Sequence, residues 1–270
     1  NSWCSNSYDV LSSSDLVDWH VEQYSFATKG LGKQTDYTDK VLYAPDGIYH
    51  NGKYYLYYCA EKSIGLAVSN HPYGPFENLS VEEPFLSMEK LEKGIVIDQV
   101  IDPSIFVDHD GRNYLYFGNS ETPAVVELED DMCTMIPGTM KNIIYEGKAD
   151  CREAFMTVYE QGRYHFTWSC DDTRSEDYHV NYGISDSPLG PVKVIGTILQ
   201  KNVEKDILGT GHHGMIKDPV TGKYLIAYHR FSHSLPEGVS GWDRGAFRET
   251  CLDWLEMSED GLFKEVEVSE

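Results

Sequence analysis

One sequence unit occurs four times in this chain, and this repetition restricts the possible folds more than any other feature. In each copy an acidic or histidine residue is followed by an apolar strand, a glycine-containing turn and a second strand rich in aromatic residues. The residues at the equivalent position of the four copies are Asp46, Asp102, Glu153 and His212. Successive positions are 56, 51 and 59 residues apart.

A period of this length with about four strands per unit is typical of a β-propeller. Two of the strand pairs are followed by a further apolar strand, at 64–69 and 180–185. The innermost strand of each propeller blade lies next to the axis, so we expect the four equivalent residues to line one end of a central channel. The alternative is that they are ordinary turn residues preceding strands, because Asp-Gly and Asp-Pro are common in turns.

The first segment, residues 8–19, matches the later part of a repeat and not its beginning. We therefore expect the first two strands of one blade to precede residue 1, together with a fifth equivalent of Asp46 and Asp102. The chain begins at Asn1 and shows neither an initiator methionine nor a signal peptide, so the sequence predicts no cellular location.

Charge and composition restrict the partners. A net charge of −22 disfavours binding to nucleic acid or to an anionic membrane, since both require a basic surface. No apolar run is long enough for a membrane-spanning helix. The cysteines form no C-x-x-C pair, which favours buried thiols over disulfides or a metal site. They are Cys4, Cys59, Cys133, Cys151, Cys170 and Cys251.

Six short motifs follow one another in a specific order. They are Ala44-Pro45-Asp46, the stretch Ile101-Asp102-Pro103-Ser104-Ile105-Phe106, Arg152-Glu153-Ala154-Phe155, Gly209-Thr210-Gly211-His212-His213, Tyr228-His229-Arg230, and Arg248-Glu249-Thr250-Cys251. Together they resemble glycoside hydrolase family 43, which includes β-xylosidases, α-L-arabinofuranosidases and arabinanases. The resemblance implies an all-β, five-bladed β-propeller over residues 1–270, as a single catalytic domain whose first blade is incomplete, and a carbohydrate substrate.

The resemblance also implies catalytic roles. Enzymes of this family hydrolyse glycosidic bonds with inversion, using a carboxylic acid that protonates the leaving oxygen and a carboxylate that activates water. By motif match Glu153 is the general acid, and Asp102 is the carboxylate that tunes and orients it. The family base is an aspartate in the first blade, which we expect before Asn1. Asp46 is the fallback base and otherwise shapes the pocket.

Further residues are expected to bind the sugar or an ion. Arg230 resembles a family arginine that binds sugar hydroxyls, and His212 resembles an axial histidine that faces calcium or water in some members. Imidazole is a poor calcium ligand, so a structural calcium ion in the channel would be held mostly through waters, and no cofactor is required. Flat aromatic faces suit sugar stacking. The candidates for stacking are Tyr43, Phe155 and Trp168.

The sequence therefore predicts an inverting glycosidase acting on xylose- or arabinose-containing plant cell-wall oligosaccharides or polysaccharides. Two alternatives stay open. One is a non-catalytic carbohydrate-binding propeller that has lost its base, and the other is a galactose-type glycosidase on the same fold. The sequence does not choose between xylose and arabinose, between exo and endo action, or between oligomeric states.

Overall fold

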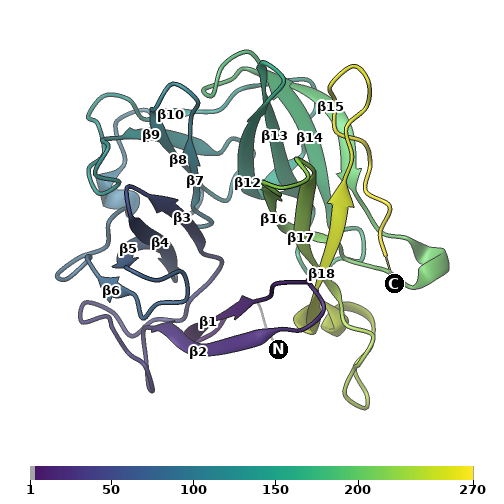
Figure 1. Cartoon of the computed structure of the whole chain (residues 1–270), viewed down its shortest axis with the longest axis horizontal. Helices are drawn as coiled ribbons and strands as arrows, with labels where there is room; N and C mark the ends of the chain where they lie inside the picture. The colour runs from purple at the N-terminus through teal and green to yellow at the C-terminus, as the bar shows by residue number, and fades with distance from the viewer. Residues whose placement is uncertain (1–3, 270) are drawn as a thin grey trace. The chain divides into compact units, whose positions relative to one another are not determined.

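The computed structural model describes residues 4–269, which form strands, three short 3-10 helices and connecting loops (Figure 1). Its contacts divide these residues into two compact units. The N-terminal unit comprises residues 4–119 and 124–141, and the C-terminal unit comprises residues 120–123 and 142–269. Among the described residues, no helix is long and apolar enough to cross a membrane. A single domain over residues 1–270 stays a prediction.

The N-terminal unit contains three antiparallel sheets, and in each of them strands that follow one another in the chain pair side by side. The first sheet is β1 (Ser7–Ser12) and β2 (His20–Ala27). The second is β3 (Asp46–His50), β4 (Lys53–Ala60), β5 (Ser63–Ser69) and β6 (Glu77–Asn78), and the 3-10 helix η1 (Met88–Lys90) follows it. The third is β7 (Ser104–Val107), β8 (Asn113–Phe117), β9 (Ala124–Leu128) and β10 (Lys141–Asn142).

The C-terminal unit contains two sheets, one of five strands and one of three (Figure 1). One has the order β11-β15-β14-β13-β12 and is antiparallel except for the parallel pair β11 and β15. Its strands are β11 (Tyr145–Glu146), β12 (Cys151–Glu160), β13 (Arg163–Cys170), β14 (His179–Ser185) and β15 (Val192–Leu199). The other is β16 (Gly211–Lys217), β17 (Tyr224–Phe231) and β18 (Arg248–Leu255), with η2 (Val203–Lys205) and η3 (Gly241–Ala246) in the connections.

The four sequence repeats form the first two strands of four sheets, as predicted. Asn51 and Gly52 join β3 to β4 with φ angles of 47° and 82°, and Gln161 and Gly162 join β12 to β13 with 50° and 82°. Two successive positive φ angles are the signature of a type I′ turn, whose twist matches that of paired strands. The third strands expected at 64–69 and 180–185 are β5 and β14. Cys59, Cys151 and Cys170 are buried free thiols, as predicted, whereas the free thiols Cys4, Cys133 and Cys251 are only partly buried.

Asp46 connects two sheets of the N-terminal unit. Its Oδ2 accepts a hydrogen bond of 2.7 Å from the backbone N–H of Ile105 at β7, and its Oδ1 accepts one of 2.8 Å from Gly47. Both carboxylate oxygens are thus used to satisfy backbone donors at the start of the two sheets. This structural role argues against Asp46 as a fallback base, because a base needs an oxygen directed at a water molecule.

The ionisation of Asp46 provides a test of this connection. Burial raises the pKa of Asp46 to about 6, against the opposing effect of the two N–H donors. A folded-state pKa above that of the unfolded chain favours folding at low pH, and this stabilisation disappears as the pH rises through about 6. We therefore expect the wild-type protein to lose up to about 3 kcal/mol relative to Asp46→Asn between pH 4 and pH 7.

Denaturant unfolding of both proteins across this pH range measures the difference, and the constant cost of the amide substitution cancels from the slope. Asp98→Asn removes the same charge from an exposed position and serves as the control for the loss of one negative charge. Parallel pH dependences for the wild type and Asp46→Asn would show that the carboxylate is solvated and does not connect the sheets.

Candidate active site

Glu153 lies in an irregular part of β12. The strand pairs regularly with β13 from Met156 to Glu160, but its register shifts on both sides of Glu153. Ala154 has a φ of 55°, a conformation that a residue with a side chain rarely adopts. Bulges of this kind redirect side chains and are common beside active sites. Glu153 is only 8% exposed, and Ala154, which follows it, is the residue that breaks the alternation of buried and more exposed positions along the strand.

Tyr178 contacts this carboxyl directly. Its hydroxyl donates a hydrogen bond of 2.7 Å to Oε1 of Glu153, and the tyrosine side chain is fully buried in the segment before β14. The aromatic ring lies against Gly211 at the start of β16, where an added Cβ would be 2.4 Å from a ring carbon. Only glycine fits there. No sequence motif pointed to Tyr178, because it belongs to no repeat.

Arg248 supplies positive charge to the same place. It begins β18, and its charge interacts with Glu153 and Tyr178. The guanidinium is oriented by Nε, which donates to the carbonyl of Gly245 at 2.9 Å, and by Nη2, which donates to the carbonyl of Thr173 at 3.1 Å. Burial lowers the pKa of Arg248, but a guanidinium stays charged in proteins. A developing negative charge on Glu153 would therefore be stabilised.

Arg230, the arginine predicted to bind sugar, has a different environment. Its side chain is 8% exposed, and Nε donates to Oε1 of Glu249 at 2.9 Å while Nη1 donates to the carbonyl of Ser269 at 3.0 Å. This buried ion pair argues against a role in sugar binding. The sequence did contain a signal for Arg248. The motif that begins with this residue is one of the six that carry the family resemblance, and no function was assigned to it.

His212 lies close to Glu153. It has a φ of 47°, and its backbone N–H donates to Oγ of Ser169 at 3.0 Å. A ring nitrogen of His212 and a carboxylate oxygen of Glu153 lie within 4.8 Å of each other. The neighbouring His213 is buried instead, bonds through Nε2 to Oγ1 of Thr167 at 2.6 Å, and has its pKa lowered to about 3 by burial and by His212. His213 is a neutral core residue, whereas His212 belongs to the candidate site.

The pair His212 and Glu153 does not by itself suit calcium. Calcium takes six to eight oxygen ligands, and imidazole is a poor substitute for them. Of these two side chains only the carboxylate of Glu153 supplies oxygen, and one of its oxygens already accepts the bond from Tyr178. The water-mediated calcium ion stays a prediction, and no catalytic step is assigned to it.

Two of the aromatic residues predicted to stack on sugar lie in the core. Trp168 is fully buried and its Nε1 donates to the carbonyl of Ala149 at 2.8 Å. Phe155 is 2% exposed and packs against Trp168 and Phe166, with ring centroids 6.4 Å and 5.3 Å apart. Buried rings present no face to a substrate, so both residues are better explained by packing.

Asp102 and Tyr43 lie in the N-terminal unit. Asp102 precedes β7, is 5% exposed and has a φ of 53°, a strained conformation of the type found at functional positions. Burial and, secondarily, the charge of Asp102 raise the pKa of Cys59 well above its usual value. Tyr43 is partly exposed, and its carbonyl accepts the hydroxyl of Tyr8 at 2.5 Å. Tyr43 therefore keeps a ring surface that could contact a sugar.

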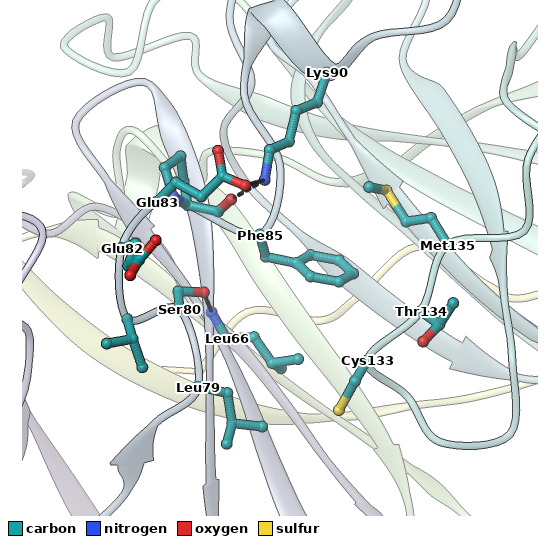
Figure 2. Close-up of a pocket in the computed structure, with 12 residues that line it drawn as sticks. Leu66, Leu79, Ser80, Glu82, Glu83, Phe85, Lys90, Cys133, Thr134 and Met135 are labelled. Atoms are coloured by element: carbon teal, nitrogen blue, oxygen red, sulfur yellow. Dashed lines mark hydrogen bonds and ion pairs between the residues drawn. The ribbon is translucent and has the colours of Figure 1, made fainter.

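The N-terminal unit also contains a cavity of about 560 Å³ (Figure 2). Phe85 and Met135 line it, and Lys90 is held at its edge by Oε1 of Glu83 at 3.0 Å and by the carbonyl of Pro84 at 2.6 Å. Its lining includes none of the predicted site residues, and its one lysine is already neutralised. We assign it no function.

Comparison with known proteins identifies relatives over nearly the whole chain. The family model described as glycosyl hydrolases family 43 matches residues 2–263. A β-D-galactofuranosidase of Aspergillus niger is 32% identical over 97% of this chain and 75% of its own length. A xylosidase/arabinosidase of Humicola insolens is 28% identical over 80% of this chain and 77% of its own length.

Solved structures give the same result. An α-L-arabinofuranosidase from Clostridium thermocellum has a TM-score of 0.77 at 26% identity and covers 96% of this chain and 82% of its own. An endo-1,4-β-xylanase from Bacteroides thetaiotaomicron, at 24% identity, has a TM-score of 0.79 over 98% of this chain and 87% of its own. The predicted all-β propeller is confirmed, and its structural neighbours in this family have five blades. This chain therefore belongs to glycoside hydrolase family 43.

Proposed function

We propose that this protein is an inverting glycosidase that cleaves xylose- or arabinose-containing plant cell-wall oligosaccharides or polysaccharides, with Glu153 as the general acid. The observation that carries the proposal is the environment of Glu153. It is a buried carboxyl group at the position that matches the family acid, with the Tyr178 hydroxyl on one oxygen and the Arg248 charge nearby.

In the proposed reaction Glu153 gives its proton to the leaving glycosidic oxygen while the bond from that oxygen to the anomeric carbon breaks. The carboxylate that forms is stabilised by the hydrogen bond from Tyr178 and by the charge of Arg248. Water attacks the anomeric carbon from the opposite face and loses a proton to the base. The base of this family is an aspartate, and we assign the tuning of the acid to Asp102.

Sugar recognition is assigned to three residues in this proposal. Arg248 bonds to backbone carbonyls through Nε and Nη2, and its guanidinium carries further N–H donors that suit sugar hydroxyls. His212 lies beside the acid, and the partly exposed ring of Tyr43 suits stacking. A water-held calcium ion near His212 would be structural and take no part in bond cleavage.

A second candidate substrate is a β-D-galactofuranoside. The galactofuranosidase of Aspergillus niger is similar over 97% of this chain, and galactofuranose and arabinofuranose share a five-membered ring. A non-catalytic sugar-binding propeller is the alternative from a different functional class. Rates of hydrolysis of three 4-nitrophenyl glycosides distinguish these candidates. The three are the β-D-xylopyranoside, the α-L-arabinofuranoside and the β-D-galactofuranoside.

For Glu153→Gln we expect kcat/KM for the cleaved glycoside to fall by about 10²- to 10⁴-fold. Glutamine keeps the shape and the acceptor for Tyr178 but cannot act as an acid. Release of 4-nitrophenol measures the loss. Glu160→Gln is the matched control, because Glu160 lies on the same strand and accepts a tyrosine hydroxyl, from Tyr224 at 3.0 Å.

Equal activity of Glu153→Gln and Glu160→Gln would show that Glu153 is not the general acid. Wild-type protein that binds xylo- or arabino-oligosaccharides in calorimetry, yet hydrolyses none of the three glycosides, would support the sugar-binding alternative.

The assignment of sugar binding to Arg248, and not to Arg230, gives a separate prediction. Arg248→Lys should lower kcat/KM by about 10- to 100-fold, because lysine cannot keep both carbonyl bonds and also present donors to the sugar. Arg230→Lys should lower the melting temperature through its buried ion pair and leave the kinetic constants within about threefold. Steady-state kinetics and thermal unfolding of both variants decide the point, and the reverse pattern would restore Arg230 as the substrate ligand.

A further inference from the structure

We propose that Tyr178 is a positioning residue that determines which oxygen of Glu153 carries the catalytic proton. The inference rests on the proposed role of Glu153 as the acid and deepens it. Tyr178 has no counterpart among the repeated motifs, and it comes from the segment that joins β13 to β14. Its position therefore depends on tertiary packing alone.

A slot between two paired strands holds the tyrosine ring. Gly211 on β16 lies directly opposite His229 on β17, and side chains of such partners occupy the same face of a sheet. The missing side chain at Gly211 leaves a space beside the imidazole of His229. The Tyr178 ring fills it, stacked on His229 at 5.4 Å between centroids with an angle of 3° between the ring planes.

The slot leaves the hydroxyl group little freedom. A Cβ at Gly211 would lie 2.4 Å and 2.5 Å from two carbons of the tyrosine ring, so the ring already touches the β16 backbone. Burial, with Arg248 and His212, lowers the pKa of His229 well below its usual value, and the stacking partner therefore stays neutral. The hydroxyl is held at 2.7 Å from Oε1 of Glu153.

This bond assigns the proton of the acid to a particular atom. Oε1 accepts from the tyrosine hydroxyl, so in neutral Glu153 the carboxylic proton resides on Oε2. During hydrolysis that proton passes from Oε2 to the glycosidic oxygen, which takes the electron pair of the breaking bond. The Tyr178 bond then faces a full carboxylate and becomes charge-assisted, so it is stronger after proton transfer than before.

Several groups of the C-terminal unit face Glu153 and enter any pH profile. They are Tyr178 from the β13–β14 connection, His212 from β16, Arg248 from β18 and Cys151 from β12. Burial raises the pKa of Cys151 to about 12, which keeps this thiol uncharged. His212, Arg248 and Cys151 are unchanged in a Tyr178 variant, so their contributions cancel when its pH profile is compared with that of the wild type.

The test compares Tyr178→Phe with Tyr228→Phe on aryl glycosides of graded leaving-group acidity. Tyr228 is a matched control, since its buried hydroxyl also donates to a carboxylate, Oδ2 of Asp253, at 2.6 Å. For Tyr178→Phe we expect a loss of about 10- to 100-fold in kcat/KM with poor leaving groups and less than about threefold with activated ones. The alkaline limb of kcat/KM should also move to higher pH, since the carboxylate loses a donor.

A second variant tests the role of Tyr178 in case Tyr178→Phe does not fold, and an NMR measurement tests it without turnover. Gly211→Ala keeps the chemical hydroxyl group of Tyr178 but displaces the ring and the hydroxyl with it, so it should give the same leaving-group dependence. In carbon-13 NMR of glutamate-labelled protein, the signal assigned to Glu153 by its loss in Glu153→Gln should titrate at higher pH in Tyr178→Phe than in Tyr228→Phe.

Identical leaving-group dependence and identical NMR titration in the two phenylalanine variants would overturn the role of Tyr178. The two proposals fail separately. If Glu153→Gln keeps full activity, the proposed function fails. If Glu153→Gln is inactive and Tyr178→Phe behaves like Tyr228→Phe, only the role of Tyr178 is rejected.

Discussion

Hydrogen bonding between the first two strands of each repeat is the interaction on which the other features depend. Tight turns such as Asn51-Gly52 and Gln161-Gly162 set the register of these pairs, and a shift by one residue would exchange the two faces of a strand. The turn sets the register of the residues next to it, and in two of the repeats the register shifts again near the far end of the first strand, where the equivalent residue lies. That residue is Asp46 in one repeat and Glu153 in another, with Asp102 and His212 in the remaining two.

Equivalent positions have nevertheless acquired different functions. Asp46 accepts two backbone N–H groups and connects β3 to β7, which is a structural use of a carboxylate. Glu153 sits on a bulge and accepts a tyrosine hydroxyl instead. The difference lies in the backbone, since the register is irregular around Glu153 and regular from Asp46 to His50.

Residues outside the repeats complete the candidate site. Tyr178 comes from the connection between β13 and β14, and Arg248 is the first residue of β18. Each is held by contacts with segments distant in sequence: Gly211 and His229 for the tyrosine, Thr173 for the arginine. Loops can vary more freely than paired strands, so family members on one scaffold can change specificity there. The relatives named for galactofuranose, xylose and arabinose substrates are consistent with this division.

The sequence by itself determined the repeat, the strand pairs, the buried thiols and the family, because all of these depend on local patterns of turns, tyrosines and short motifs. It also selected Glu153 as the candidate acid. Only the tertiary structure decided which neighbours each side chain has: Trp168, Phe155 and Arg230 lie in the core, whereas Tyr178 and Arg248 contact or face Glu153. Alternation along a strand shows that a residue is buried, but the groups that bury it come from distant segments, and their identity follows from packing.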